Sequence, residues 1–511
     1  MANAPLLLGI DIGGTAVKVA LFSAAGRLYG VHNTPIRPHA PHPGWFDIDP
    51  ADWQRAVREG VAAVLAAAGA HAEDVAAIGL SNMIGTITPL DADGRPLRHA
   101  IPYYDTRSTA EAQWMLDRAP EIPTITANRV LPGNTTLTSI LWLRAHEPAV
   151  YAQAASFAPT NAFIFRWLTG EAAIDWTNAN FFGVYDVATR DWSPHLAQAL
   201  DVDLDRLGPI VAPDTIAPLT ARAAANIGLA PGTPVAIGGL DGAMSSVGAG
   251  AIRVGDAYVV CGTSEMVAVC LERPVVAHEL LGRWHVVPEL WTLIGAMTTS
   301  GAALQWLGEQ VYAPLGSESA EGAAPDLYEV MTTEAAAASP GANGVTFLPH
   351  LAGERAPWWD PHAKGVFFGL SLSTTRGDLA RAVMEGTAYA MRQLIELAEE
   401  YGRVPIRRLT ILGGGAARNP LWRRIRADVW DREIAISPVL EATALGAALT
   451  AGVGAGVFGD YAEAVEHGVP RDGEVLAPDP THHGAYEQGY RVYRQLYPAL
   501  AETMRTAATE I

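Results

Sequence analysis

The chain has 511 residues, of which 49% are hydrophobic, and its two cysteines are Cys261 and Cys270. The length indicates roughly two to four domains, and the cysteine count excludes a disulfide framework or a four-cysteine zinc site. The formal net charge of −19 argues against a surface for nucleic acid or for an anionic membrane, because either would need a basic patch. It does not exclude small anionic ligands, which backbone N–H groups can bind inside an acidic protein.

The N-terminal segment indicates no targeting signal. It has no basic region, and Asp11 interrupts its apolar run, so we expect no signal peptide. No uncharged apolar run approaches about 18 residues, so we expect no membrane span. A reduced cytoplasm is the simplest location for a chain with so few cysteines.

The first half of the sequence begins with a β-meander. Apolar and alternating patterns predict strands over residues 6–12, 16–22 and 29–36, joined by turns at 13–15 and 23–28. A helix is expected over 51–69, ended by a glycine, and a buried strand over 75–81. Residues 137–170 have an interrupted helical pattern.

The second half repeats this order. Residues 255–271 again predict a strand, a Gly-Thr turn and a strand, and 407–430 predict a strand, a glycine loop and a helix. The repetition indicates a duplicated α/β fold, with domains over 1–244 and 245–511. We expect a surface excursion over 317–344, a loop over 464–484 and a last helix over 485–508.

Two glycine hairpins are candidate phosphate sites. In "GIDIGGT", residues 9–15, the turn directs backbone N–H groups into a concavity, and Asp11 at the strand end could orient Mg²⁺ and its waters. In "CGTSE", residues 261–265, a second turn offers the same groups. Each could be an ordinary β-turn, and neither matches a Walker A loop or a dinucleotide fingerprint. Together they could grip one polyphosphate.

Two further glycine-rich stretches also allow either a functional or a purely structural interpretation. The three glycines of "ILGGGAARN", residues 411–419, permit close approach of a bulky group or a phosphate at a helix start, or simply form a strand-to-helix loop. In "GGLDGA", residues 238–243, Asp241 is either a helix cap or a base that accepts a substrate proton.

The segments 9–15, 261–265 and 411–419, in this order, resemble the FGGY family of sugar kinases, within the larger group of ATPases shared with hexokinase, actin and the Hsp70 chaperones. The stretch 365–386, "GVFFGLSLSTTRGDLARAVMEG", matches the family's C-terminal signature, and 347–361 resembles its Gly-Glu-Arg-x-Pro loop. The resemblance covers nearly the whole chain. It implies an α/β fold of two duplicated ribonuclease H-like domains with a cleft between them.

The resemblance implies transfer of the ATP γ-phosphoryl group to a sugar hydroxyl, with Asp241 as catalytic base and also in contact with the substrate. Mg²⁺ would be held by Asp11 through water. The N-terminal domain would bind the sugar and the C-terminal domain the nucleotide. The residues expected to contact ATP are Gly13, Gly14, Thr15, Gly262, Thr263, Ser264, Gly301, Gln305, Gly413, Gly414, Gly415 and Asn419.

The sugar-contacting residues follow from two shorter matches. In "SNMIG", residues 81–85, Asn82 and Met83 are expected to contact the sugar, whereas Ile84 replaces the histidine of the family members that act on xylulose. Asp105 and Arg107 match the family's Trp-x-Asp-x-Arg segment, and they could bind substrate or form a buried ion pair that fixes a loop. In addition, Gly242 follows Asp241 where the family often has Asn or Gln.

The resemblance makes D-xylulose the first expected substrate, with gluconate, another ketopentose or a polyol as alternatives. It also implies a homodimer. A non-catalytic sugar or nucleotide sensor would have no need of the base Asp241. A chaperone-like or filament-forming ATPase of the same fold would not carry the sugar-kinase signature at 365–386.

Overall fold

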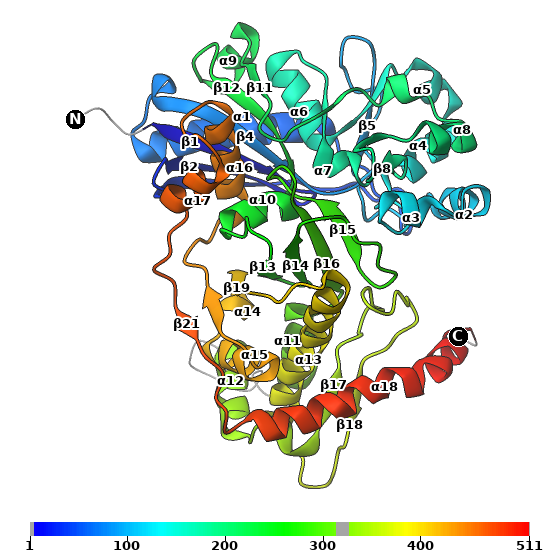
Figure 1. Ribbon diagram of the computed structural model, residues 1–511, viewed down its shortest axis with the longest axis vertical. Helices are drawn as coiled ribbons and strands as arrows, with labels where there is room; N and C mark the ends of the chain where they lie inside the picture. The colour runs from blue at the N-terminus through cyan, green and yellow to red at the C-terminus, as the bar shows by residue number, and fades with distance from the viewer. Residues whose placement is uncertain (1–4, 313–325, 510–511) are drawn as a thin grey trace, which may run out of the picture. The chain divides into compact units, whose positions relative to one another are not determined.

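The computed structural model describes residues 5–312 and 326–509, and the chain divides into two compact units (Figure 1). The first unit contains residues 1–254, 270–292 and 441–470, and the second contains 255–269, 293–440 and 471–511. The first unit therefore contains residues from both halves of the sequence, whereas the second contains residues from the second half alone. The domains expected over 1–244 and 245–511 stay a prediction. No helix within the described ranges is long and apolar enough to cross a membrane.

The first unit is built on a six-stranded sheet in the order β11-β12-β4-β1-β2-β3. β1 pairs antiparallel with β2 and parallel with β4, which in turn pairs parallel with β12. The strands are β1 (Leu6–Ile12), β2 (Ala16–Ser23), β3 (Leu28–Pro35), β4 (Val75–Asn82), β11 (Ile216–Pro218) and β12 (Pro234–Leu240). The expected meander and the fourth strand are thus confirmed.

Alternation along β1 sends its side chains into two layers. Leu8, Ile10 and Ile12 join a core cluster with Trp53 of helix α1 (Pro50–Ala68) and Phe163 of α6 (Thr160–Thr169). The other side of the sheet packs against α16 (Ala442–Gly454), which contacts β1 and β4 although it comes from the end of the chain (Figure 1). Asp11, by its parity, points toward the α16 side.

The first unit contains further helices and short strands. Among them, α10 (Asp241–Gly248) packs on α16. The others are α2 (Thr109–Arg118), α3 (Ile122–Thr126), α4 (Thr136–His146), α5 (Pro148–Gln153), α7 (Trp176–Ala179), α8 (Pro194–Leu200), α9 (Ala221–Ile227), α17 (Tyr461–Gly468), β5 (Ile87–Leu90), β6 (Ser156–Pro159), β7 (Ile174–Asp175), β8 (Tyr185–Asp186), β9 (Asp191–Trp192), β10 (Ile210–Val211) and β15 (Leu281–Trp284).

The second sheet has the order β15-β16-β14-β13-β19-β20-β21, and β13 again pairs antiparallel with the next strand and parallel with a later one. The duplicated α/β arrangement expected from the sequence is thereby confirmed. The strands are β13 (Asp256–Cys261), β14 (Glu265–Leu271), β16 (Trp291–Met297), β19 (Arg408–Gly413), β20 (Ile434–Ile436) and β21 (Val475–Leu476). A separate pair is formed by β17 (Thr346–Leu348) and β18 (Val366–Phe368).

The helices of the second unit gather around the long helix α13 (Arg376–Gly402). A capping box between Thr375 and Asp378 begins α13, and Glu385 forms an ion pair with Arg381 at 2.7 Å, so these signature residues stabilise the helix. Its neighbours are α11 (Gly301–Leu307), α12 (Leu327–Ala337), α14 (Gly415–Arg418), α15 (Pro420–Trp430) and α18 (His483–Thr509).

Two loop predictions need correction. The loop expected over 464–484 is wrong for its first residues, because α17 extends to Gly468 and begins with Asp460 accepting from the N–H of Glu463. Of the excursion expected over 317–344, residues 317–325 lie outside the described part of the chain. Residues 327–337 form α12, capped by the side chain of Asp326.

Candidate functional site

The first glycine hairpin joins β1 to β2. The N–H of Gly13 donates to Ala16 O at 2.9 Å, and the indole N–H of Trp53 donates to Gly13 O at 3.3 Å. Thr15 is exposed at the turn. The turn is therefore anchored from α1 while its outer face stays open to a ligand, as a phosphate-binding hairpin requires.

Two carboxylates meet at one edge of the first sheet. Asp11 is in register with Ser81, whose hydroxyl donates to Asp11 Oδ1 at 3.0 Å, and Asp241 directly follows the neighbouring strand β12. Burial and the nearby charge of Asp241 raise the pKa of Asp11 to about 6, against the opposing effects of Ser81 and Lys18. Parallel strands that end side by side explain why residues 230 positions apart come together.

The same edge carries an ion pair that the sequence did not reveal. Lys18 lies opposite Asp11 in the β1–β2 register, and its Nζ is 2.6 Å from Glu441 Oε2, just before α16. The alternation of β2 showed only that Lys18 faces away from the core. Nothing in the sequence linked it to a residue 423 positions later.

The carboxylate edge fits a hydrated Mg²⁺ ion. Mg²⁺ usually keeps several waters and takes one or two carboxylates together with substrate phosphates. Burial and the nearby charge of Asp241, which raise the pKa of Asp11, both penalise its negative charge, and a divalent cation would relieve that penalty. The described residues contain no group of three His, Cys, Asp or Glu side chains suited to hold a metal directly. The role of Asp11 through water stays a prediction.

Asp241 is the first residue of α10, and the preceding Leu240 occupies the N-cap position. Its carboxylate accepts from the N–H of Gly242 at 2.5 Å. The residue is exposed, yet desolvation around the carboxyl raises its pKa, while Gly242 and Arg283 act to lower it. A carboxylate with a raised pKa, on a residue that is exposed as a whole, is suited to accept a proton.

Arg283 of β15 packs directly against Gly242. A Cβ atom at Gly242 would lie 2.4 Å from an Arg283 guanidinium nitrogen, so a larger residue would require this guanidinium to move. Arg283 is 3% exposed, and its Nε donates to Thr292 Oγ1 at 3.2 Å. The glycine that departs from the family's Asn or Gln thus makes room for a buried cation beside Asp241.

Asn82 and Met83 end strand β4 and are both buried. The Asn82 amide is engaged with Asn178, which donates to Asn82 Oδ1 at 3.0 Å, and it also donates to Met83 O at 2.8 Å. Asn178 is itself held by Asp175, the N-cap of α7. In this arrangement Asn82 supports the strand end. Its predicted contact with sugar stays a prediction, as does that of Met83.

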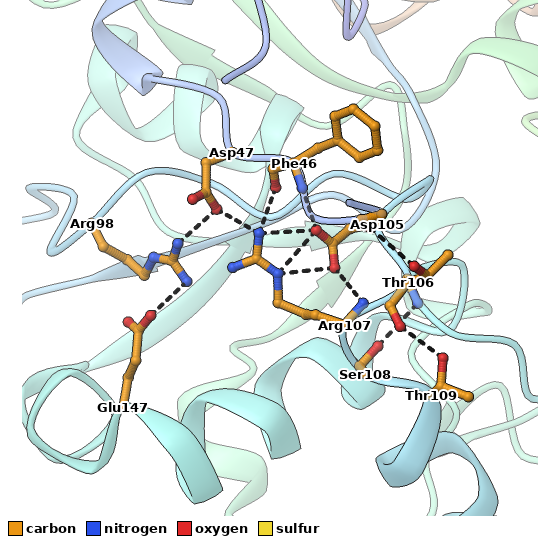
Figure 2. Close-up of polar contacts among 11 residues, drawn as sticks. Phe46, Asp47, Arg98, Asp105, Thr106, Arg107, Ser108, Thr109 and Glu147 are labelled. Carbon is orange, nitrogen blue, oxygen red and sulfur yellow. Dashed lines mark hydrogen bonds and ion pairs between the residues drawn. The ribbon is translucent and has the colours of Figure 1, made fainter. Parts of the chain in front are cut away.

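Asp105 and Arg107 lie in a buried ion network, which Figure 2 shows. Each side chain is 1% exposed, and the Arg107 guanidinium lies 2.9 Å from both Asp105 and Asp47. Asp47 also pairs with Arg98 at 2.7 Å. The rings of Trp45 and Trp142 flank Arg107, with its guanidinium carbon 4.8 and 5.0 Å from their centroids.

This network favours the loop-fixing interpretation of Asp105 and Arg107. Asp105 also accepts from the N–H of Phe46 at 2.5 Å, which ties residues 46 and 47 to the loop after residue 102. The Asp105 carboxylate and the Nε and Nη2 groups of Arg107 are therefore engaged by protein partners. Direct contact of either residue with substrate stays a prediction.

The second hairpin lies against helix α11. The N–H of Gly262 donates to Ser264 O at 2.9 Å, and those of Ser300 and Gly301 donate to Thr263 O and Gly262 O at 2.9 and 3.0 Å. Gly262, Thr263 and Ser264 are exposed. The hairpin and the helix start therefore form one rigid edge.

A cavity of about 710 Å³ opens beside this edge, within the second unit. Such a volume suits a nucleoside. Five predicted nucleotide residues line it: Gly262, Thr263, Gly301, Gln305 and Asn419. Gly413, Gly414 and Gly415 end β19 and begin α14, a few residues before Asn419.

The same cavity has lining residues that the sequence did not single out. They include Tyr328, Thr332 and Arg418, and Asn419 Nδ2 donates to Thr332 Oγ1 at 2.7 Å. Asn419 also caps α15 by accepting from the N–H of Trp422. For Tyr328 and Thr332 the available signal was the cap residue Asp326, which begins the helix α12 that carries them.

Comparisons with known proteins find the same family in both halves of the chain. The models of the N-terminal and C-terminal domains of the FGGY family of carbohydrate kinases match residues 6–248 and 257–455. The xylulose kinase of Escherichia coli strain K12 is 32% identical over 98% of this chain and 100% of its own length. The gluconokinase of Bacillus licheniformis is 27% identical over 99% and 96%.

The fold agrees as well with a solved structure. The crystal structure of xylulose kinase from Rhodospirillum rubrum superposes with a TM-score of 0.88 at 30% identity, covering 98% of this chain and 100% of that one. The mixed α/β two-domain fold expected from the resemblance is confirmed.

Proposed function

The chain belongs to the FGGY family of carbohydrate kinases, and from that premise we propose that it transfers the γ-phosphoryl group of ATP to D-xylulose, giving D-xylulose 5-phosphate. It is a carbohydrate kinase of the xylulokinase-like kind. The observation that carries the proposal is the exposed residue Asp241 at the start of α10, with its carboxyl group beside Asp11. D-xylulose comes first because the relatives aligned over the full length include xylulose kinases.

The proposed mechanism assigns each region one task. Asp241 accepts the proton of the attacking hydroxyl, and the N–H of Gly242 orients its carboxylate. The N–H groups of the two hairpins bind phosphate oxygens, and the 710 Å³ cavity receives the adenosine. Asp11 would hold Mg²⁺ through water, and the ion would neutralise charge on the phosphates.

A sugar acid such as gluconate is the second candidate. The guanidinium of Arg283 places a positive charge beside Asp241, and a gluconokinase is among the full-length relatives. Ile84 also lacks the hydrogen-bonding group of the histidine found in relatives that act on xylulose. Another ketopentose or a polyol would need no such charge. A homodimer and a cytoplasmic location are kept as proposals.

The test is a substrate panel with purified protein. ATP and Mg²⁺ are supplied with D-xylulose, other ketopentoses, gluconate and polyols, and ADP release is measured with and without each compound. We expect turnover that depends on sugar and is fastest with D-xylulose. Fastest turnover with gluconate would replace the substrate and keep the kinase. No turnover with any compound would favour the non-catalytic sensor.

Asp241→Asn tests the base directly. Removing a general base is expected to lower kcat by about a hundredfold or more, because proton transfer contributes 10²–10⁴-fold. ADP binding, measured by calorimetry, should be unchanged. Asp93→Asn, at an exposed turn, is the matched control and should keep full activity. If Asp241→Asn retains turnover, Asp241 is not the base.

A further inference from the structure

The phenol of Tyr104 lies beside the first hairpin. A Cβ atom at Gly14 would be 3.1 Å from a ring carbon of Tyr104, 3.3 Å from its hydroxyl oxygen and 3.1 Å from the sulfur of Met83. Three separate parts of the first unit therefore meet at this point: the turn after β1, the end of β4 and the loop after residue 102. A side chain at position 14 would have little room, because the other two residues occupy the space.

The hydroxyl of Tyr104 is a buried polar group without a hydrogen-bond partner among the residues that the structure describes. Burial raises the pKa of Tyr104 to about 12, so the group keeps its proton and can donate. A buried hydroxyl that bonds to nothing costs free energy. Such a group in a binding site is explained when a ligand oxygen completes its hydrogen bond.

Tyr104 is also held in one orientation. Its ring packs edge-on against Phe46, with centroids 5.0 Å apart, and against Tyr103 at 5.2 Å. The next residue, Asp105, accepts from the N–H of Phe46 and pairs with Arg107. The buried ion network of Figure 2 thus fixes the residues on both sides of the phenol, which is how a preorganised binding group is supported.

We propose that the Tyr104 hydroxyl donates a hydrogen bond to an oxygen of the sugar and is a specificity-determining residue of this kinase. This inference rests on the proposed function. Met83, its neighbour, is expected to touch the sugar, whereas Ile84 beside Met83 has no hydrogen-bonding side chain. Tyr104 places a donor at that same strand end. A site that bonds a substrate hydroxyl discriminates strongly against molecules that lack it.

Tyr104→Phe tests the proposal, because it removes the hydroxyl and keeps the ring packing. With D-xylulose as the probe, or with whichever panel sugar turns over fastest, we expect kcat/KM to fall by about tenfold or more, mainly through a higher sugar KM. The KM for ATP should stay within about twofold of the wild-type value, since the hydroxyl is assigned to the sugar. Tyr29→Phe, on exposed strand β3, is the matched control and should leave both constants unchanged.

Three outcomes would overturn the inference. One is an unchanged sugar kcat/KM in Tyr104→Phe. Another is an equal rise in the KM values for ATP and sugar, which would assign the hydroxyl to phosphate or to packing. The third is a lowered Tm of the unliganded variant with unchanged sugar affinity, which would make Tyr104 structural.

A binding measurement separates this inference from the proposed function. Sugar alone, without ATP, should raise the Tm of the wild type by mass action and raise that of Tyr104→Phe less. If the wild type binds sugar but never phosphorylates it, the proposed function fails and the role of Tyr104 stands. If both proteins phosphorylate the sugar and bind it equally, the role of Tyr104 fails and the kinase stands.

Discussion

At the scale of single residues, the surroundings of Asp241 set the pKa of its carboxyl group. It lies beside a like charge, Asp11, and a buried cation, Arg283, and its pKa is raised by desolvation that Arg283 partly offsets. Gly242 leaves the space that the guanidinium fills. Gly242, which departs from the family pattern, and Arg283 therefore pack against each other, because the glycine has no side chain where the guanidinium lies.

Arg283→Met is expected to lower kcat/KM on the acid side of its pH profile. Without the cation, the pKa of Asp241 rises further, so a smaller fraction of the base is ionised and the acid limb of the pH–rate profile moves to higher pH. Activity should recover partly at alkaline pH, and Arg283→Lys should retain more activity than Arg283→Met. The measurement is the pH dependence of kcat/KM for the best panel sugar.

The control for this prediction is Arg58→Met, at an exposed position on α1. It should leave the profile unchanged. An Arg283→Met profile that falls equally at every pH would mean that Arg283 acts through packing alone, without an electrostatic effect on Asp241.

At the scale of elements, strand β15 carries Arg283 into the first unit together with His285 just beyond its end. The ring of Trp284, the last residue of β15, stacks between the rings of Trp176 and Trp291, with centroid distances of 4.3 and 5.5 Å. His285 is fully buried; its Nε2 donates to Ala251 O at 3.0 Å, and its Nδ1 accepts from the N–H of Val287 at 2.9 Å. Both ring nitrogens are thus used in the neutral form.

Stability is expected to fall as the pH drops below about 6.5, in part because of His285. Burial, with Arg283 nearby, lowers the pKa of His285 to about 3, so the unfolded state binds a proton that the folded state does not. The cost is about 2 kcal/mol at pH 5 and is absent above the unfolded pKa. His285→Gln should show a smaller loss of Tm between pH 7.5 and pH 5 than the wild type.

His278→Gln is the matched control, since His278 is exposed in the segment before β15. It should keep the wild-type pH dependence. Identical losses of Tm in the wild type and in His285→Gln would show that the low-pH destabilisation comes from other groups.

At the scale of the whole molecule, the packed units do not follow the order of the chain. Helix α16 comes after residue 440 and yet forms a layer of the first unit. At Gly9 and Gly79 a Cβ atom would lie 1.9 and 1.8 Å from the carbonyl oxygens of Ala444 and Ala447, so the helix backbone rests directly on strands β1 and β4. The sheet cannot bury that face without it.

A fragment ending at residue 254 is therefore expected not to fold stably. It lacks α16 and exposes the apolar face that α16 covers, and it also lacks Glu441, the partner of Lys18. Soluble yield, far-UV circular dichroism and limited proteolysis would be compared with those of a fragment that appends residues 441–470 through a flexible linker. Only the second fragment should resist protease. Equal resistance of the two fragments would contradict the prediction.

Local sequence signals predicted many of the elements. The strand expected over 6–12 is β1 itself, and the helix expected over 51–69 is α1 within one residue, because Asp49 and Gly69 provide its caps. Prediction failed at α12, whose cap residue Asp326 lies inside the expected excursion over 317–344, and at the end of α17, whose cap residue Asp460 precedes the expected loop over 464–484. Both helices follow glycine- or alanine-rich stretches, and because of this composition the cap residues were not recognised as helix starts.

What the sequence determined alone was the kind of chemistry. Two glycine hairpins, Asp11, Asp241 and the signature at 365–386 are local patterns, and local patterns survive without knowledge of the fold. Through the family resemblance they were enough to indicate a sugar kinase and to propose Asp11 and Asp241 as residues of its site.

What only the tertiary structure decided was which residues lie next to them. Arg283 beside Gly242, Glu441 beside Lys18, and the hydroxyl of Tyr104 beside Gly14 all join positions far apart in the chain. The sequence alone likewise does not show that Asp105 and Arg107 pair in a buried ion network. The physical reason is that sheet order and helix packing, which bring distant strand ends to one edge, are set by long-range burial of apolar faces.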